Sequence, residues 1–289
     1  DGGFSETTTA SFSVDFATGY EDGTNAGDSL GAYYGFQIDL NTSFTGEDSL
    51  DISLDAGNAS GTGVAEFDLN SAGDTLAVDG VSYTFPLAGA TVIVGDNTDG
   101  SAMFTTACAY GGPSNTLDDC ANVNAGITNG GLAVGASYEI GNGFTAAVGY
   151  AGAETGILTE GVMDAYGANL FYDGGSYGVS VTYGIIEQTA TTENTYTALN
   201  GYYSFDNGIS ISAGYEVGDL GGGTALADET EAYFIGVNGE VGPGELGAAI
   251  GTAGVTTESS GNMIERLMYE AYYSYEVNDG MTVTPLVYV

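Results

Sequence analysis

The sequence predicts an all-β fold, an antiparallel transmembrane β-barrel that forms a single domain over residues 1–289, and three observations support it. Apolar and polar residues alternate along most of the chain, the pattern of strands with one apolar and one polar face. Many of these runs reach the length of about 10 residues that crosses a bilayer when a strand is tilted. Short and long connections alternate between the runs, as in barrels with short periplasmic turns and long external loops.

The N-terminal half contains five expected strands. In the first, Phe12, Val14 and Phe16 share one face and Ser11 and Ser13 the other. A proline near the end of the fourth suits a turn, because an interior proline would remove a ladder hydrogen bond. A loop at 57–75 separates the third and fourth strands, and Val64 to Leu69 within it is compatible with a short extra strand. The expected strands are 7–18, 31–44, 50–55, 76–87 and 90–95.

The C-terminal half is a regular series of hairpins. The last, residues 263–289, turns at Asn278-Asp279-Gly280, and Asp-Gly between alternating runs is a strong hairpin signal. Aromatic residues collect near the short turns, where an aromatic girdle would meet the membrane interface; they include Phe144, Phe171, Tyr172 and Phe205. A soluble sandwich would also alternate and would fill its core with aromatics, but strand and loop lengths favour the barrel. The other expected strands are 131–140, 143–152, 162–172, 176–188, 194–205, 208–217, 229–240 and 244–254.

These runs make fifteen strands, so the first and the last point the same way. A bacterial single-chain barrel normally has an even number of strands. We therefore expect a sixteenth, closing strand that would follow Val289 and is missing from this sequence. The polar start at Asp1 is what a processed product would have.

The chain carries 39 acidic residues and one basic residue, Arg266, for a net charge of −38. Nucleic acid is excluded as a partner, because its binding rests on Lys and Arg. There is no His, so base-assisted nucleophiles are missing, as are phosphate clamps. Carboxylate pairs such as Glu229 with Glu231, or Asp118 with Asp119, are all that remains for a glycosidase. We expect no enzyme and no cofactor.

The longest irregular stretch, about residues 96–129, contains both cysteines of the chain, Cys108 and Cys120. Loops of this length within a folded domain are usually functional or disordered. A zinc site would need more thiolates or imidazoles, so we expect no metal. We expect a disulfide that staples the loop and implies an oxidising compartment; two free thiols are the alternative. The loop's acidic residues are Asp96, Asp99, Asp118 and Asp119.

Residues 40–50, Leu-Asn-Thr-Ser-Phe-Thr-Gly-Glu-Asp-Ser-Leu, continue to Ala-Gly-Asn at 56–58. This stretch resembles the second hairpin of cyanobacterial outer-membrane porins, the carbohydrate-selective or iron-uptake porin family. Residues 83–87 with 90–95 resemble the next hairpin of that family, and residues 280–285 resemble its penultimate strand. Three departures stand out. Asp51, Ser53 and Asp55 replace basic residues on the inward face of the third strand, and the family's N-terminal surface-layer-homology domain and its closing strand are missing.

The resemblance implies a trimer-forming general-diffusion barrel in the outer membrane of a Gram-negative-type, cyanobacterial organism, with membrane lipid, small hydrophilic solutes and cations as partners. Acids of inward parity would line its lumen, and rings of carboxylates favour cations. The loop would narrow the pore, with Asp118 and Asp119 at the constriction. A structural or adhesive cell-surface protein with calcium-binding acidic loops is the alternative, although the loop spacing of a calcium-binding hand is missing. The expected lining residues are Asp15, Asp39, Asp51, Asp55, Glu139, Glu216, Glu240, Glu270 and Glu276.

Overall fold

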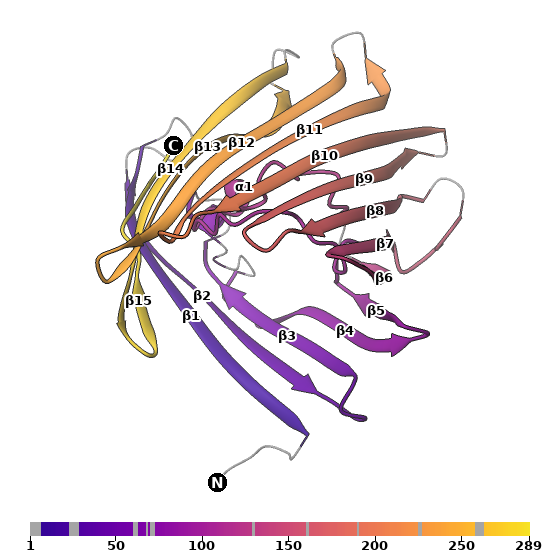
Figure 1. Ribbon diagram of the computed structural model, residues 1–289, viewed down its shortest axis with the longest axis horizontal. Helices are drawn as coiled ribbons and strands as arrows, with labels where there is room; N and C mark the ends of the chain where they lie inside the picture. The colour runs from indigo at the N-terminus through magenta and orange to yellow at the C-terminus, as the bar shows by residue number, and fades with distance from the viewer. Residues whose placement is uncertain are drawn as a thin grey trace.

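The protein forms one antiparallel sheet in which each strand from β1 to β14 pairs with the next along the chain, and β16 pairs with β14. Figure 1 shows this sheet curving around an interior that contains α1 (Asn115–Asp118). The computed structural model describes residues 7–22, 29–59, 63–67, 69, 73–128, 131–159, 162–189, 191–224, 227–257 and 263–289. The strands are β1 (Thr8–Glu21), β2 (Ser29–Thr42), β3 (Ser49–Gly57), β4 (Ala77–Leu87), β5 (Ala90–Asp96), β6 (Leu132–Gly141), β7 (Phe144–Gly152), β8 (Asp164–Asp173), β9 (Tyr177–Thr189), β10 (Thr192–Ser204), β11 (Ile209–Thr224), β12 (Ala227–Val241), β13 (Gly244–Thr257), β14 (Met263–Asn278), β15 (Met281–Val283) and β16 (Leu286–Tyr288).

The two faces of the strands differ as the alternation predicts, with the apolar face on the outside. Phe16 is 80% exposed and Ile235 is 53% exposed, whereas the inward-facing Ala232 is 1% exposed. A soluble sandwich would bury its large apolar side chains and expose the polar ones. An apolar exterior around a polar interior is the arrangement of a transmembrane barrel, and the all-β prediction is confirmed.

Aromatic pairs mark the short-turn end of the barrel on its outer face. The ring centroids of Phe144 and Tyr172 are 4.7 Å apart, and those of Tyr203 and Phe205 are also 4.7 Å apart. Phe171 departs from the expected girdle, because it shares the parity of the inward-facing Asn169 and lies next to the inner side of Gly178. The remaining rings form the band that anchors such barrels at the membrane interface.

The last expected strand is interrupted. β15 and β16 pair with β14 in one continuous register, in which Tyr275 lies opposite Val283 and Tyr272 opposite Leu286. Pro285, between the two segments, has no N–H to give to the ladder. The sixteen strands therefore occupy fifteen positions in the sheet. Within the described ranges, no ladder joins β1 to β15 or β16, and the closing strand stays a prediction.

Two connections contain short helices. Residues Gly63–Phe67 form a 3₁₀ helix, η1, so the extra strand considered for Val64 to Leu69 is wrong. The loop after β5 contains α1, a single turn whose Leu117 is buried. None of the helices in the described part of the chain is long and apolar enough to cross a membrane.

Candidate pore constriction

The loop between β5 and β6 lies inside the barrel along the inner wall (Figure 1). Some of its backbone N–H groups bond within the loop, and side chains of the wall accept from others. The Ala107 N–H donates to Ser180 Oγ on β9, and the Ala109 N–H donates to Ser212 Oγ on β11, both at 2.8 Å. Asn169 on β8 accepts from the Thr105 N–H at 3.1 Å. The loop is therefore tied to several strands by hydrogen bonds to their inward-facing side chains.

Inward-facing glycines give the loop room to lie this close to the wall. Gly149, Gly167 and Gly184 lie opposite one another on β7, β8 and β9. A Cβ atom at Gly184 would come within 3.1 Å of Ala125 Cα, and one at Gly214 would overlap the carbonyl oxygen of Cys120. These contacts explain why glycine occupies inward positions where a strand would ordinarily place a side chain.

Two of the expected pore-lining acids face the interior, but the loop covers them. Glu216 is 1% exposed, and its carboxylate accepts hydrogen bonds from the Asn124 and Ala125 N–H groups and from the Asn124 side chain, each at 2.8 Å. Glu270 is 3% exposed and accepts from the Tyr110 hydroxyl at 2.7 Å. Burial, reinforced by this hydrogen bond, raises the pKa of Tyr110 and keeps its hydroxyl protonated. Both acids hold the loop.

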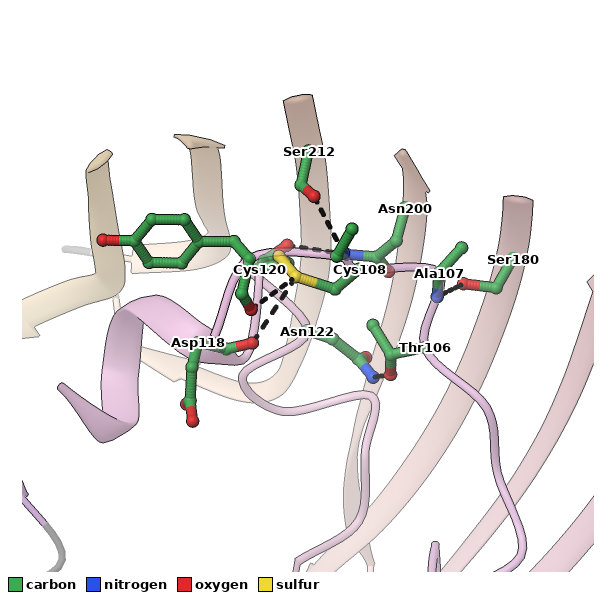
Figure 2. The surroundings of a disulfide bond; sticks show 11 residues. Thr106, Ala107, Cys108, Asp118, Cys120, Asn122, Ser180, Asn200 and Ser212 are labelled. Carbon is green, nitrogen blue, oxygen red and sulfur yellow. Dashed lines mark hydrogen bonds between the residues drawn. A yellow bond between two sulfur atoms is a disulfide. The ribbon is translucent and has the colours of Figure 1, made fainter. Parts of the chain in front are cut away.

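Cys108 and Cys120 form a disulfide within the loop (Figure 2). Asn200 on β10 donates to the Cys120 carbonyl at 2.6 Å, and Asn122 donates to Thr106 Oγ1 at 2.8 Å. The disulfide and the Asn122 contact join the two arms of the loop, and Asn200 holds them to the wall.

The acidic residues of the α1 turn lie beside the disulfide, where the Asp118 carbonyl oxygen is 3.7 Å from Cys108 Sγ. In Figure 2 the carboxylate of Asp118 points away from the strands that carry Ser180, Asn200 and Ser212. Asp119, the next residue, is exposed. Leu117 anchors this turn in a cluster with Phe234 and Ala249, and its full burial stabilises the contact by about 1.5–3 kcal/mol. The wall thus holds the turn by an apolar side chain and leaves Asp118 directed away from it.

Acids on β2 and β3 form a second polar surface, across the interior from the strands that carry the loop (Figure 1). Asp39 accepts hydrogen bonds from Gln37 and Ser53, both at 2.7 Å. Asp51 accepts from Asn41 at 2.6 Å and from Ser49 at 2.8 Å. Hydrogen bonds of this kind restrict the position of each carboxylate on the inner face. The inner wall therefore presents oriented negative charges.

Three further acids share one neighbourhood where the loop leaves β5. The negative charge of Asp79 on β4 repels the carboxylates of Asp55 on β3 and of Asp99 in the loop. The surrounding protein removes part of the hydration of Asp99, and this desolvation, followed by the charge of Asp79, raises the pKa of its carboxyl group. The loop acid and the wall acids are therefore close enough to interact.

The other expected site residues are accessible and are spread along the barrel. Asp15, Asp96, Glu139, Glu240 and Glu276 are all exposed. Glu245 is an interior acid outside the expected set; it lies opposite the inward-facing Glu240 and accepts a 2.6 Å hydrogen bond from Tyr272. The hairpin register alone would have identified Glu245, because directly paired residues share a face.

The arrangement offers little for metal binding or glycoside hydrolysis. Within the described ranges, no group of three or more acidic or cysteine side chains could hold a metal ion. Glu229 and Glu231 share the outward parity of the exposed Ile235, so this pair does not face the interior. Asp118 and Asp119 are neighbours on a single turn.

No protein-family model matches the chain, and no curated protein matches it in sequence. Solved structures do resemble it. A loop-deletion form of OmpT, an outer membrane protein of Vibrio cholerae, superimposes with a TM-score of 0.67 at 13% identity, covering 98% of this chain and 93% of that one. A mutant of the Rh. blastica porin gives 0.61 at 13% identity, covering 97% and 94%. In-vitro folded OmpT in its trimer form gives 0.65 at 12%, covering 98% and 89%. The chain therefore has the β-barrel fold of outer-membrane porins.

Proposed function

We propose that the protein is an outer-membrane porin through which small hydrophilic solutes and ions diffuse passively. The observation that carries this proposal is the loop inside the barrel, hydrogen-bonded to the wall through Ser180, Ser212 and Glu216. A loop held in this way narrows a pore to a fixed width, which a purely structural surface barrel does not need. The exposed apolar outer face fits lipid.

The pore favours cations over anions. Asp118 and Asp119 lie on the interior loop, Asp39 and Asp51 lie on the inner wall, and the sole basic residue of the chain is Arg266. Carboxylates on both sides of a narrow passage attract cations and repel anions. Iron, inorganic cations, sugars and small peptides are all compatible with such a passage, because the selectivity is a charge bias.

Location and assembly follow from the same fold. Porins of this type lie in the outer membrane of Gram-negative-type bacteria, and the motifs at residues 40–58 favour a cyanobacterial source. A disulfide suits that oxidising compartment. A homotrimer is supported by the trimer form of the similar OmpT.

Conductance in planar lipid bilayers tests this function. Purified protein is expected to insert as ohmic channels, and a KCl gradient is expected to give a reversal potential that favours K⁺ over Cl⁻. The triple variant Asp39→Asn, Asp51→Asn and Asp55→Asn should reduce that preference. Failure to form channels, or a preference for Cl⁻, contradicts the proposal.

A matched control separates wall charges from net charge. The triple variant Asp219→Asn, Glu229→Gln and Glu231→Gln removes the same number of charges from outward-facing positions of β11 and β12. It should leave the ratio of K⁺ to Cl⁻ permeability unchanged. The calcium-binding adhesive alternative predicts instead that calcium stabilises the protein against unfolding and that no conductance is seen.

A further inference from the structure

A second connection reaches the interior and touches the loop. The carboxylate of Glu66, in η1 between β3 and β4, accepts a 2.8 Å hydrogen bond from the backbone N–H of Thr116. Thr116 lies in the first turn of α1, where backbone N–H groups have no partner within the helix. Residues 50 positions apart in the chain are therefore joined inside the barrel.

The connection that contains η1 is itself fixed to the wall. Val64 and Leu69 are buried with Ala59, and Ala17 of β1 and Tyr33 of β2 pack against them. At the other side of η1, Phe67 makes an edge-to-face contact with Tyr288 of β16, with ring centroids 5.7 Å apart. η1 thus contacts both the first two strands and the last strand, and it presents Glu66 from this base.

α1 is also held by the wall. Leu117 packs in the apolar cluster of β12 to β14, which Tyr288 also contacts. α1 therefore lies between two supports, the wall through Leu117 and η1 through Glu66. The residue after Leu117 is Asp118, whose carboxylate points away from the strands behind the disulfide (Figure 2). The orientation of α1 decides where that charge lies.

We propose that Glu66 is a positioning residue of the pore, and that η1 is a second constriction element. Through its hydrogen bond to Thr116, Glu66 fixes the orientation of α1 and hence the place of Asp118 in the passage. The contact needs an acceptor oxygen at the end of a side chain of this length, and the charge of that oxygen is secondary. This inference rests on the proposed function, because it assigns the width of the same pore.

Two substitutions separate the hydrogen bond from the charge. Glu66→Gln keeps an acceptor oxygen at the same distance and removes the charge, whereas Glu66→Ala removes the acceptor. In planar bilayers, Glu66→Gln should conduct like the wild type, and Glu66→Ala should show a changed single-channel conductance, by about 1.5-fold or more, with more frequent current fluctuations. Equal effects of the two variants, or no effect of Glu66→Ala, overturn the proposal. Glu231→Ala, which removes an outward-facing glutamate of β12, is the control and should leave the fluctuations unchanged.

A second measurement does not depend on conduction. Hydrogen–deuterium exchange of the peptide that contains Thr116 should be slow in the wild type and in Glu66→Gln. Loss of a hydrogen bond to a charged group should speed exchange in Glu66→Ala by about tenfold or more. If the exchange rate of this peptide in Glu66→Ala equals that of the wild type, the hydrogen bond between Glu66 and Thr116 does not exist in solution, whether or not the protein conducts. If the Thr116 amide of the wild type is protected but the protein forms no channels, the proposed function is wrong. The contact between Glu66 and Thr116 would then exist without a role in a pore.

Discussion

The carboxylate of Glu216 accepts two hydrogen bonds from Asn124, one from its backbone N–H and one from its side-chain amide, both at 2.8 Å. The two residues are 92 positions apart, on β11 and in the interior loop. A buried carboxylate needs such donors, because desolvation without them is costly. This pair therefore holds the return arm of the loop against the wall.

Replacing Glu216 with Ala should loosen the loop and destabilise the barrel. The change leaves the Asn124 and Ala125 N–H groups without their acceptor. Breaking a hydrogen bond to a charged group costs about 1.5–3 kcal/mol, and the cost is smaller where a water molecule takes the place of the lost acceptor. Unfolding in denaturant, monitored in detergent, measures the loss, and bilayer recordings should show noisier currents. Glu240→Ala, at an exposed position of β12, should change neither. Equal stability of Glu216→Ala and the wild type would refute the anchoring role.

Adding one methyl group at Gly214 should displace the loop. A Cβ atom there would overlap the carbonyl oxygen of Cys120 and lie 2.5 Å from Asn200 Nδ2. Overpacking of this kind typically costs about 1–3 kcal/mol, so Gly214→Ala should lower the denaturation midpoint and alter conductance. Gly201→Ala is the matched control on β10, where the nearest atom, Gly178 O, is 3.3 Å from the new Cβ. If both variants behave alike, the close approach of loop and wall is not the reason for glycine at position 214.

Reducing the disulfide should free the loop without unfolding the barrel. Cys108 and Cys120 close a short loop with a sequence separation of 12, and such a crosslink contributes about 2–4 kcal/mol, mostly by constraining the unfolded chain. The hydrogen bonds of Ser180 and Ser212 to the loop remain, so the barrel should stay folded while current fluctuations increase in dithiothreitol. The channel currents of the double variant Cys108→Ser and Cys120→Ser should fluctuate to the same extent, with or without dithiothreitol. A response of that variant to dithiothreitol would show that the reductant acts elsewhere.

Acidification should weaken the cation preference of the pore, beginning with the protonation of Asp99. Its pKa is raised, so as the pH falls it takes up a proton before carboxylates with the ordinary aspartate pKa of about 4. The ratio of K⁺ to Cl⁻ permeability should therefore begin to fall above that range. Reversal potentials across a pH series measure the ratio. Asp99→Asn should lower the ratio at neutral pH and remove this first step, and Asp79→Asn should move the step to lower pH by removing a negative neighbour. A step that persists in Asp99→Asn belongs to another group.

The sequence by itself determined the fold and the faces of its strands. Alternation placed Phe12 and Phe16 outside and Asp39 and Asp51 inside, because a residue's side of a strand depends only on its position along it. The turn at residues 278–280 and the disulfide partners were likewise local signals. The hairpin register also encodes the inward face of Glu245, because it pairs directly with Glu240.

Tertiary structure alone decided which inward residues face open space. Glu216 on β11 and Glu270 on β14 were both expected to line the lumen, but the loop runs along the inner wall as far as β14 and covers them. That path depends on contacts between distant segments, such as Asn124 with Glu216 and Glu66 with Thr116. Periodicity describes each strand against its own neighbours, and no local pattern encodes where an irregular loop settles inside the barrel.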